Sequence, residues 1–203
     1  MEGWRGARAM GECFLRSAAA VLHTCMVIIT TERLLLRQVH IGDLDVFTAL
    51  FADPMVMRFG PGTQDRAWTQ RWISGCLEDY HRTWGFGLWA VVDRAQAAVI
   101  GFCGLTYYHE LSGAPAIELG YRLQVSSWGH GFGREAARAV ARHSIEVLTL
   151  TRLVALIDAE NQRSIRVARD CGLKHIGETV LRGVSTGLYA APRAEIALAL
   201  ARP

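Results

Sequence analysis

The chain has 203 residues, of which 51% are hydrophobic and 20% are charged, and its formal net charge is +3 at pH 7. This length suits one compact domain with a full hydrophobic core. The small basic excess, without a cluster of Lys and Arg among aromatic residues, argues against a nucleic-acid-binding surface. No apolar run is long enough to span a bilayer, which argues against a membrane protein.

The cysteines show neither a metal-binding nor a disulfide pattern. They are scattered along the chain at Cys13, Cys25, Cys76, Cys103 and Cys171. An odd number of isolated cysteines, without a CxxC pair or a regular spacing to histidine, is typical of reduced thiols in the cytoplasm. We therefore expect a cytoplasmic protein that binds no metal.

The N-terminal segment differs from the rest of the chain. Arg16 interrupts its apolar run and no small-residue cleavage site follows, so a secretory signal is not favoured. We expect residues 1–27 to form a disordered extension, and a natural start at Met26 would explain it. Residues 28–203 are expected to form the folded domain.

The domain is predicted to begin with a strand and two helices. Residues 31–37 are predicted to form the strand. Asp43 is typical of a helix N-cap, and Asp53-Pro54 ends that helix. The second helix is predicted at residues 64–80, where apolar residues recur at helical spacing, after a loop at residues 57–62.

Three strands joined by short turns are predicted next. Residues 87–92 and 99–108 flank a turn at residues 93–96, and a further strand follows at residues 116–124. Polar and apolar residues alternate in this last strand. One face carries Ile117, Leu119, Tyr121 and Leu123, and the other carries Glu118, Gly120, Arg122 and Gln124.

The last part of the chain alternates helices with strands. Helices are predicted at residues 134–148 and 161–171, and the first has an apolar stripe of small residues. Residues 153–157 are continuously apolar, as in a central strand that is covered on both faces. Strands at residues 173–180 and 194–200 surround an irregular segment that contains glycine.

The stretch from Ser127 to Ala136 places glycines at positions 129, 131 and 133, between a predicted strand and a predicted helix. Such a turn leaves backbone N–H groups and the positive end of the helix dipole available to a phosphate. A P-loop is excluded, because the turn ends in Gly133-Arg134-Glu135 and not in Gly-Lys-Ser/Thr. Alternatively, the glycines only serve a tight turn.

A dinucleotide-binding fingerprint is a second alternative. Residues 131–136 match the pattern GxGxxA, and Asp158 follows the next strand, where a ribose-binding acid would lie. However, residues 125–128 separate the strand from the glycines, and the remaining chain supplies too few strand–helix repeats. The fingerprint is therefore not favoured.

Four segments in a fixed order carry a family resemblance: Glu118–Tyr121, Trp128–Ala136, Asn161–Val167 and Cys171–Leu173. Together they resemble the GNAT superfamily of acetyl-CoA-dependent N-acetyltransferases, and most closely its RimJ/RimL-like branch, of which the opening TERLLLR of residues 31–37 is also typical. The resemblance implies an α/β (α+β) fold, in which helices flank a mixed, mostly antiparallel seven-stranded sheet. A splayed strand pair would form the acetyl-CoA cleft.

The resemblance also implies a binding site for acetyl-CoA, which acts as a co-substrate without a metal. The implied positions are Leu123, Gln124, Val125, Trp128, Gly129, His130, Gly131, Phe132, Gly133, Arg134, Asn161 and Ser164. Main-chain groups near residues 123–125 would pair with the pantetheine amides like an added strand. Asn161 suits a helix N-cap equally well, and Ser164 could simply face solvent.

Acetyl transfer to an amine requires a proton acceptor and a donor to the carbonyl oxygen. The resemblance implies direct attack without an acyl-enzyme, so the cysteines are not candidate nucleophiles. Glu118 is the candidate base, acting through water, although an ion-paired strand residue is the alternative. Many family members carry a tyrosine acid at the position of Ala168, which leaves the general acid unidentified here.

The expected acceptor is a primary amine, either of a protein N-terminus or of a small molecule. The sequence leaves a homodimer open. The alternative function is a non-catalytic acyl-CoA sensor or an interaction module on the same fold.

Overall fold

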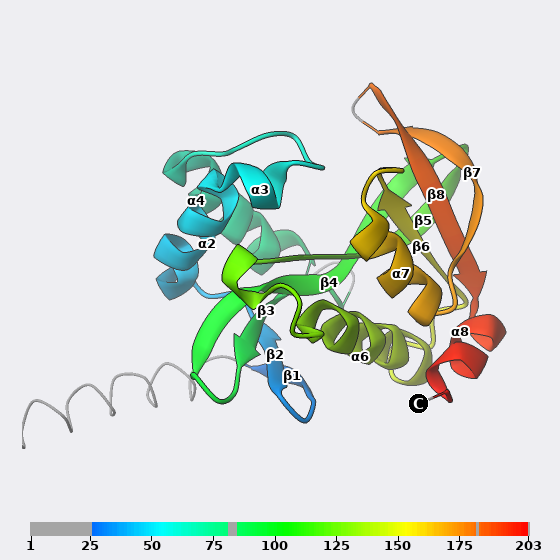
Figure 1. Ribbon diagram of the computed structural model, residues 1–203, viewed down its shortest axis with the longest axis horizontal. Coiled ribbons are helices and arrows are strands. Elements are labelled where there is room, and N and C mark those ends of the chain that lie inside the picture. The colour runs from blue at the N-terminus through cyan, green and yellow to red at the C-terminus, as the bar shows by residue number, and fades with distance from the viewer. Residues whose placement is uncertain (1–25, 81–84, 182, 203) are drawn as a thin grey trace, which may run out of the picture.

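The computed structural model describes residues 26–80, 85–181 and 183–202. Its centre is an eight-stranded sheet in the order β1-β2-β3-β4-β5-β6-β8-β7 (Figure 1). The strands are β1 (Val27–Thr30), β2 (Leu34–Gln38), β3 (Leu88–Asp93), β4 (Ala98–Leu111), β5 (Ala114–Leu123), β6 (Arg152–Ile157), β7 (Lys174–Leu181) and β8 (Val184–Pro192). The α-helices are α2 (Leu44–Ala52), α3 (Pro54–Met57), α4 (Arg66–Gly75), α6 (Phe132–Glu146), α7 (Gln162–Asp170) and α8 (Arg193–Leu200). Shorter turns are η1 (Ile41–Asp43), η2 (Cys76–Tyr80) and η3 (Val125–Ser127).

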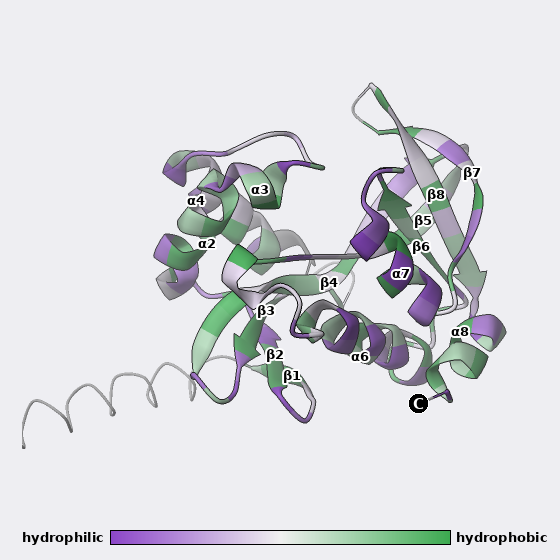
Figure 2. Ribbon diagram, in the orientation of Figure 1, coloured by the Kyte–Doolittle hydropathy of each residue, from purple (hydrophilic) through white to green (hydrophobic). Residues whose placement is uncertain are grey.

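Helices cover both faces of the sheet, and alternate strand residues divide between two cores. On one face, Trp89 of β3 and Leu105 of β4 join the core under α6, α7 and α8. On the other face, Ala90 and Phe102 join an aromatic core under α2, α3 and α4. Figure 2 shows the apolar central strands between these layers, and hydrophilic stretches along α7. The alternation of β5 therefore places neighbouring side chains in different layers.

Strands β5 and β6 form the splayed pair that the resemblance implies. They run parallel and, within these fully described strands, pair only at Glu118 and Val154. On the opposite edge of β5, the pairing with β4 continues to Leu123, opposite Gly101. Beyond Glu118, β5 therefore keeps one neighbour and separates from the other.

Several predicted boundaries need correction at the N-terminal side. The predicted strand at residues 31–37 begins later, because residues 31–33 form the turn between β1 and β2, in which the Thr31 hydroxyl accepts a hydrogen bond from the Leu34 N–H at 2.9 Å. Of the predicted extension at residues 1–27, residues 1–25 lie outside the described part of the chain. Val27 belongs to β1. The predicted helix at residues 64–80 is α4 followed by the wider turn η2.

The C-terminal prediction was wrong in one element. Residues 194–200 belong to α8, and the preceding irregular segment is largely β8. This exchange leaves the number of strands unchanged, and β1 is the additional strand that makes the sheet eight-stranded and not seven-stranded. Ile196, Leu198 and Leu200 stand at every second position, a spacing that also fits a strand. In the helix, Ile196 and Leu200 share the buried face, while Leu198 is 68% exposed. Alanine, leucine and glutamate also favour a helix by intrinsic propensity.

Candidate active site

The glycine turn and the start of α6 form a cluster of backbone donors. Gly129 and Gly131 have φ angles of 81° and 82°, which only glycine adopts without strain. None of the N–H groups of residues 129–134 donates to an acceptor in the described part of the chain, and the first helical bond runs from Glu135 to Gly131. A side-chain carbon at Gly129 would meet no atom within 4 Å, so the turn is open on that side. This arrangement suits an anionic ligand.

Gly133 serves a different purpose from the other two glycines. A Cβ atom at this position would lie 2.9 Å from Cε2 of Tyr121. Because Gly133 has no side chain, the first turn of α6 can rest on the Tyr121 ring of β5. The third glycine of the turn is therefore required by packing between helix and strand.

The hairpin between β1 and β2 holds the start of α6. The Glu135 carboxylate accepts hydrogen bonds from the Thr31 hydroxyl at 2.6 Å and from Arg33 Nε at 2.7 Å. Arg33 also donates to the carbonyl oxygen of His130 at 2.9 Å and lies over the Phe132 ring. Burial alone would raise the pKa of Glu135, but these hydrogen bonds and the guanidinium outweigh it and lower the pKa. The turn is thus fixed from outside its own sequence.

Trp128 lies at the end of the separated edge of β5. The Gln124 N–H donates to the Ile100 carbonyl on the β4 side at 2.8 Å. Because main-chain groups alternate between the two edges of a strand, those of Tyr121 and Leu123 face the side from which β6 has separated. The Leu123 carbonyl accepts a hydrogen bond from Trp128 Nε1 at 2.9 Å. Of the implied strand positions, the Leu123 carbonyl thus already accepts a hydrogen bond from the indole, and the Gln124 N–H already donates to the β4 side.

Asn161 and Ser164 lie at the start of α7, where the N-cap role expected as an alternative is observed. The Asn161 side chain accepts a hydrogen bond from the Ser164 N–H at 3.2 Å. The Ser164 hydroxyl lies 3.3 Å from the Tyr121 hydroxyl and so joins α7 to β5 across the splayed pair. Burial raises the pKa of Tyr121, and the hydrogen bond with Ser164 only partly opposes this. The phenol therefore stays protonated at neutral pH.

Glu118 lies at the last paired position before β5 and β6 separate, on the face opposite α6. Its Oε2 accepts a hydrogen bond from the Tyr108 hydroxyl at 2.9 Å. A Cβ atom at Gly120 would approach only the Glu118 carboxyl group, at 3.9 Å, among the described residues. Arg122, farther along this face, donates to the Val56 carbonyl at 3.0 Å and so ties β5 to α3. The carboxylate thus borders an open stretch of strand.

The cysteines in the described part of the chain are buried and free. Burial raises the pKa of the Cys171 thiol to about 12 and that of Cys103 still further, so neither forms a thiolate at neutral pH. This agrees with a reaction that uses no cysteine nucleophile. Among the described residues, no group of His, Cys, Asp or Glu could hold a metal ion, and no helix is long and apolar enough to cross a membrane.

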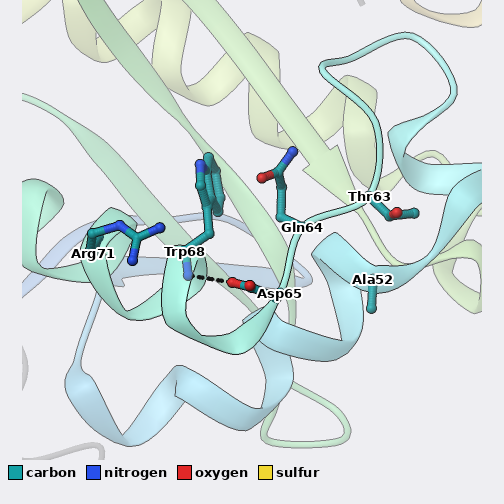
Figure 3. Close-up of a pocket in the computed structure, with 6 residues that line it drawn as sticks. All are labelled: Ala52, Thr63, Gln64, Asp65, Trp68 and Arg71. Carbon is teal, nitrogen blue, oxygen red and sulfur yellow. Dashed lines mark hydrogen bonds between the residues drawn. The ribbon is translucent and has the colours of Figure 1, made fainter.

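A shallow hollow lies at the start of α4, away from the positions implied by the resemblance. Figure 3 shows the Trp68 and Gln64 side chains extending in the same direction at this hollow, with the Asp65 carboxylate accepting a hydrogen bond from the Trp68 N–H at 2.7 Å. None of the implied site residues lines it. The Asp65 carboxylate is already hydrogen-bonded as the N-cap of α4. The hollow therefore has fewer groups available for catalysis than the region where β5 and β6 separate.

Three contributors were missed by sequence reasoning. Arg33 contacts the turn from 102 residues away, and no local pattern connects it with Glu135. Tyr108 could have been found from the hairpin register, which places it opposite Ala116 and near Glu118. The contact between Tyr121 and Ser164 depends on how α7 packs, so the sequence carried no signal for it.

Comparison with known proteins identifies the family of this chain. The family model described as "Acetyltransferase (GNAT) domain" matches residues 33–174. The chain is 31% identical over 153 residues to the uncharacterized protein YkkB of Bacillus subtilis (strain 168), a match that covers 75% of this chain and 87% of that protein. It is 28% identical over 148 residues to the uncharacterized N-acetyltransferase p20 of Bacillus licheniformis, covering 72% and 82% of the two chains.

The fold is similar to that of a spermidine N-acetyltransferase from Vibrio cholerae, solved in complex with CoA and spermine. The TM-score is 0.66 at 18% identity, over 82% of this chain and 99% of that chain. At this identity the similarity concerns the fold alone. The match of the family model over most of the domain is the stronger finding, and it shows that the chain belongs to the GNAT family as an acetyl-CoA-dependent N-acetyltransferase.

Proposed function

We propose that acetyl-CoA and an acceptor amine meet between β5 and β6 from opposite faces of the sheet, and that Glu118 acts as the general base. The observation that carries this proposal is the position of Glu118. It occupies the last paired residue before the strands separate, while the glycine turn and Tyr121 lie on the other face. A reaction by direct attack needs such an opening, because both reactants must reach one carbon atom.

In the proposed reaction, the amine nitrogen attacks the thioester carbonyl carbon, a C–N bond forms and the C–S bond breaks. Glu118 accepts the amine proton through a water molecule, and Tyr108 holds its carboxylate in place. Main-chain N–H groups on the separated edge of β5 donate to the carbonyl oxygen as it gains charge. The hydroxyl groups of Tyr121 and Ser164 lie on the coenzyme side, where the thiolate leaves.

The glycine turn is proposed to hold the pyrophosphate of acetyl-CoA. The unoccupied N–H groups of residues 129–134 and the N-terminus of a 15-residue helix support this assignment. Asn161 and Ser164 border the same groove in this proposal, in addition to their structural contacts. Trp128 and the opening segment of residues 31–37 favour the RimJ/RimL-like branch.

Gly120 is proposed to mark the path of the acceptor. A glycine in the middle of a strand weakens the sheet, and it often marks a place where a ligand approaches the backbone. Its φ angle is not among the positive values, and its Cβ position is open except for Glu118. Neither backbone conformation nor packing within the described chain therefore requires glycine there. A primary amine, of a polyamine, another small molecule or a protein N-terminus, would reach Glu118 over this residue.

The test is acetyl transfer to a panel of amines, monitored by release of free thiol, with binding of acetyl-CoA measured by calorimetry. The panel should contain polyamines, amino acids, aminoglycosides and N-terminal peptides. Glu118→Gln should lower kcat by roughly 10²–10⁴-fold and leave the affinity for acetyl-CoA unchanged. Glu110→Gln, which alters an exposed carboxylate on β4, is the matched control.

Three results would count against parts of the proposal. A wild-type protein that does not bind acetyl-CoA would contradict the coenzyme site. Binding without turnover on any amine would favour the acyl-CoA sensor instead. Full activity of the Glu118→Gln variant would remove Glu118 as the base and leave the other assignments intact.

A further inference from the structure

Three arginines surround the glycine turn, and two of them are neutralised by carboxylates. Arg33 pairs with Glu135 at 2.6 Å, and Arg134 pairs with Asp170 at 2.9 Å. Arg163, in the first turn of α7, is exposed and forms no ion pair with a carboxylate in the described ranges. Its guanidinium carbon lies 5.1 Å from the centre of the Trp128 ring. One positive charge beside the turn is therefore held in place without an acidic partner.

Trp128 is a fixed support for this arginine. Its indole N–H donates to the Leu123 carbonyl at 2.9 Å, and its ring packs against buried residues of both cores. A cation over an indole face is attracted by the negative potential of the ring. This contact thus orients the Arg163 side chain and brings it from α7 to Trp128, directly before the glycines of the turn.

The contact with Trp128 leaves the Arg163 guanidinium donors available, since none of them donates to an acceptor in the described part of the chain. Arginine presents five N–H donors along the edge of one plane. The edge can still donate two parallel hydrogen bonds to a phosphate. A lysine at the same position would keep the charge but would lose both the flat stacking surface and the two-pronged donor.

We propose that Arg163 donates to a phosphate group of coenzyme A bound at the glycine turn. The backbone donors of residues 129–134 and the Arg163 guanidinium then approach the anion from two different helices, α6 and α7. Coenzyme A carries two kinds of phosphate, the pyrophosphate and the 3′-phosphate of the ribose, and both have the chemistry that arginine binds. The inference rests on the proposed coenzyme site at this turn.

Calorimetry of the full chain with coenzyme A and with 3′-dephospho-coenzyme A tests the inference. Arg163→Ala should weaken coenzyme A binding by about tenfold to hundredfold, as expected for the loss of hydrogen bonds to a charged group. Arg163→Lys should fall between this variant and the wild type. Arg166→Ala is the matched control, because it removes an exposed arginine one turn farther along α7. Melting temperatures of all variants check that the fold is retained.

The pattern of losses distinguishes the two phosphates. Equal losses for both ligands would assign Arg163 to the pyrophosphate, and a loss for coenzyme A alone would assign it to the 3′-phosphate. Wild-type affinity in Arg163→Ala, or an equal loss in Arg166→Ala, would overturn the inference while leaving the coenzyme site in place. If the wild-type protein bound neither ligand, the proposed coenzyme site itself would be contradicted.

Discussion

Arg33 Nε lies 2.7 Å from Glu135 Oε2, although 102 residues separate the two in the chain. This contact joins the β1–β2 hairpin to the first turn of α6, and the same arginine also binds the carbonyl oxygen of His130 inside the glycine turn. The turn depends on this distant hairpin for its position. A binding site of backbone donors needs such support, because N–H groups on a mobile loop would not converge on one anion.

Glu135→Gln should reduce stability in a pH-dependent way. The pKa of Glu135 is lowered from its ordinary value of 4.5, so its contacts stabilise the fold above that pH. The stabilisation is lost as the pH falls through the lowered value. Chemical denaturation at neutral pH should show a loss of about 1 kcal/mol, since the pair is partly solvated. The difference from the wild type should shrink below about pH 4.5.

Glu146→Gln provides the control for this experiment. Glu146 lies in the same helix and makes only a loose, exposed contact with Arg142 at 4.0 Å. We expect little change at any pH for this variant. A constant difference between Glu135→Gln and the wild type down to low pH would contradict the assigned role of the Glu135 carboxylate.

Gly133→Ala should destabilise the protein by about 1–3 kcal/mol, because its Cβ atom would lie 2.9 Å from the Tyr121 ring. In a Tyr121→Ala background the same substitution should cost much less, which thermal unfolding of the four proteins would reveal. Gly129→Ala should cost about 1–2 kcal/mol in both backgrounds, because its penalty comes from the positive φ angle. Equal penalties for Gly133→Ala in both backgrounds would show that the ring is not the obstacle.

Asp43→Asn should be among the most destabilising single substitutions in the N-terminal half. The Asp43 carboxylate pairs with Arg37 at 2.7 Å, and the two side chains are only 6% and 3% exposed. Removing the Asp43 charge from beside the buried guanidinium should cost about 3–5 kcal/mol in a denaturant titration. Asp45, two residues after Asp43, forms an exposed pair with Arg66. Asp45→Asn breaks this pair and should change stability by no more than about 1 kcal/mol. Similar losses in both variants would contradict the importance of burial.

Gly120→Val should affect the acceptor and spare acetyl-CoA. The branched side chain would fill the open surface beside Glu118, so the KM for the amine should rise by about tenfold or more. Gly120→Ala should be milder, since its Cβ atom would keep an ordinary distance of 3.9 Å from the carboxyl group. Steady-state kinetics with each substrate varied in turn would separate the two effects. Weakened acetyl-CoA binding with an unchanged KM for the amine would place Gly120 at the coenzyme site and contradict its assignment to the acceptor path.

The strongest sequence predictions were those with a local physical cause. The alternation along residues 116–124 predicted β5 and the opposite faces of Glu118 and Tyr121, because side chains alternate wherever a strand has two different neighbours. The N-cap at Asn161 and the glycine turn before α6 were likewise predictable, since caps and positive φ angles depend on a few adjacent residues. The wrong prediction of a strand at residues 194–200 also comes from local reasoning. A short apolar pattern fits either a strand or a helix, and here the residues form α8.

The order of most elements, the position of the glycine turn and, through four spaced segments, the family could be predicted from the sequence. The residues that complete the candidate site became evident only in the folded chain. The contacts of Arg33 with Glu135, of Tyr121 with Ser164 and of Arg163 with Trp128 all join distant segments, and β5 separates from β6 only in the assembled sheet. Such contacts depend on how layers pack, and packing is set by the whole core and not by any local run of residues.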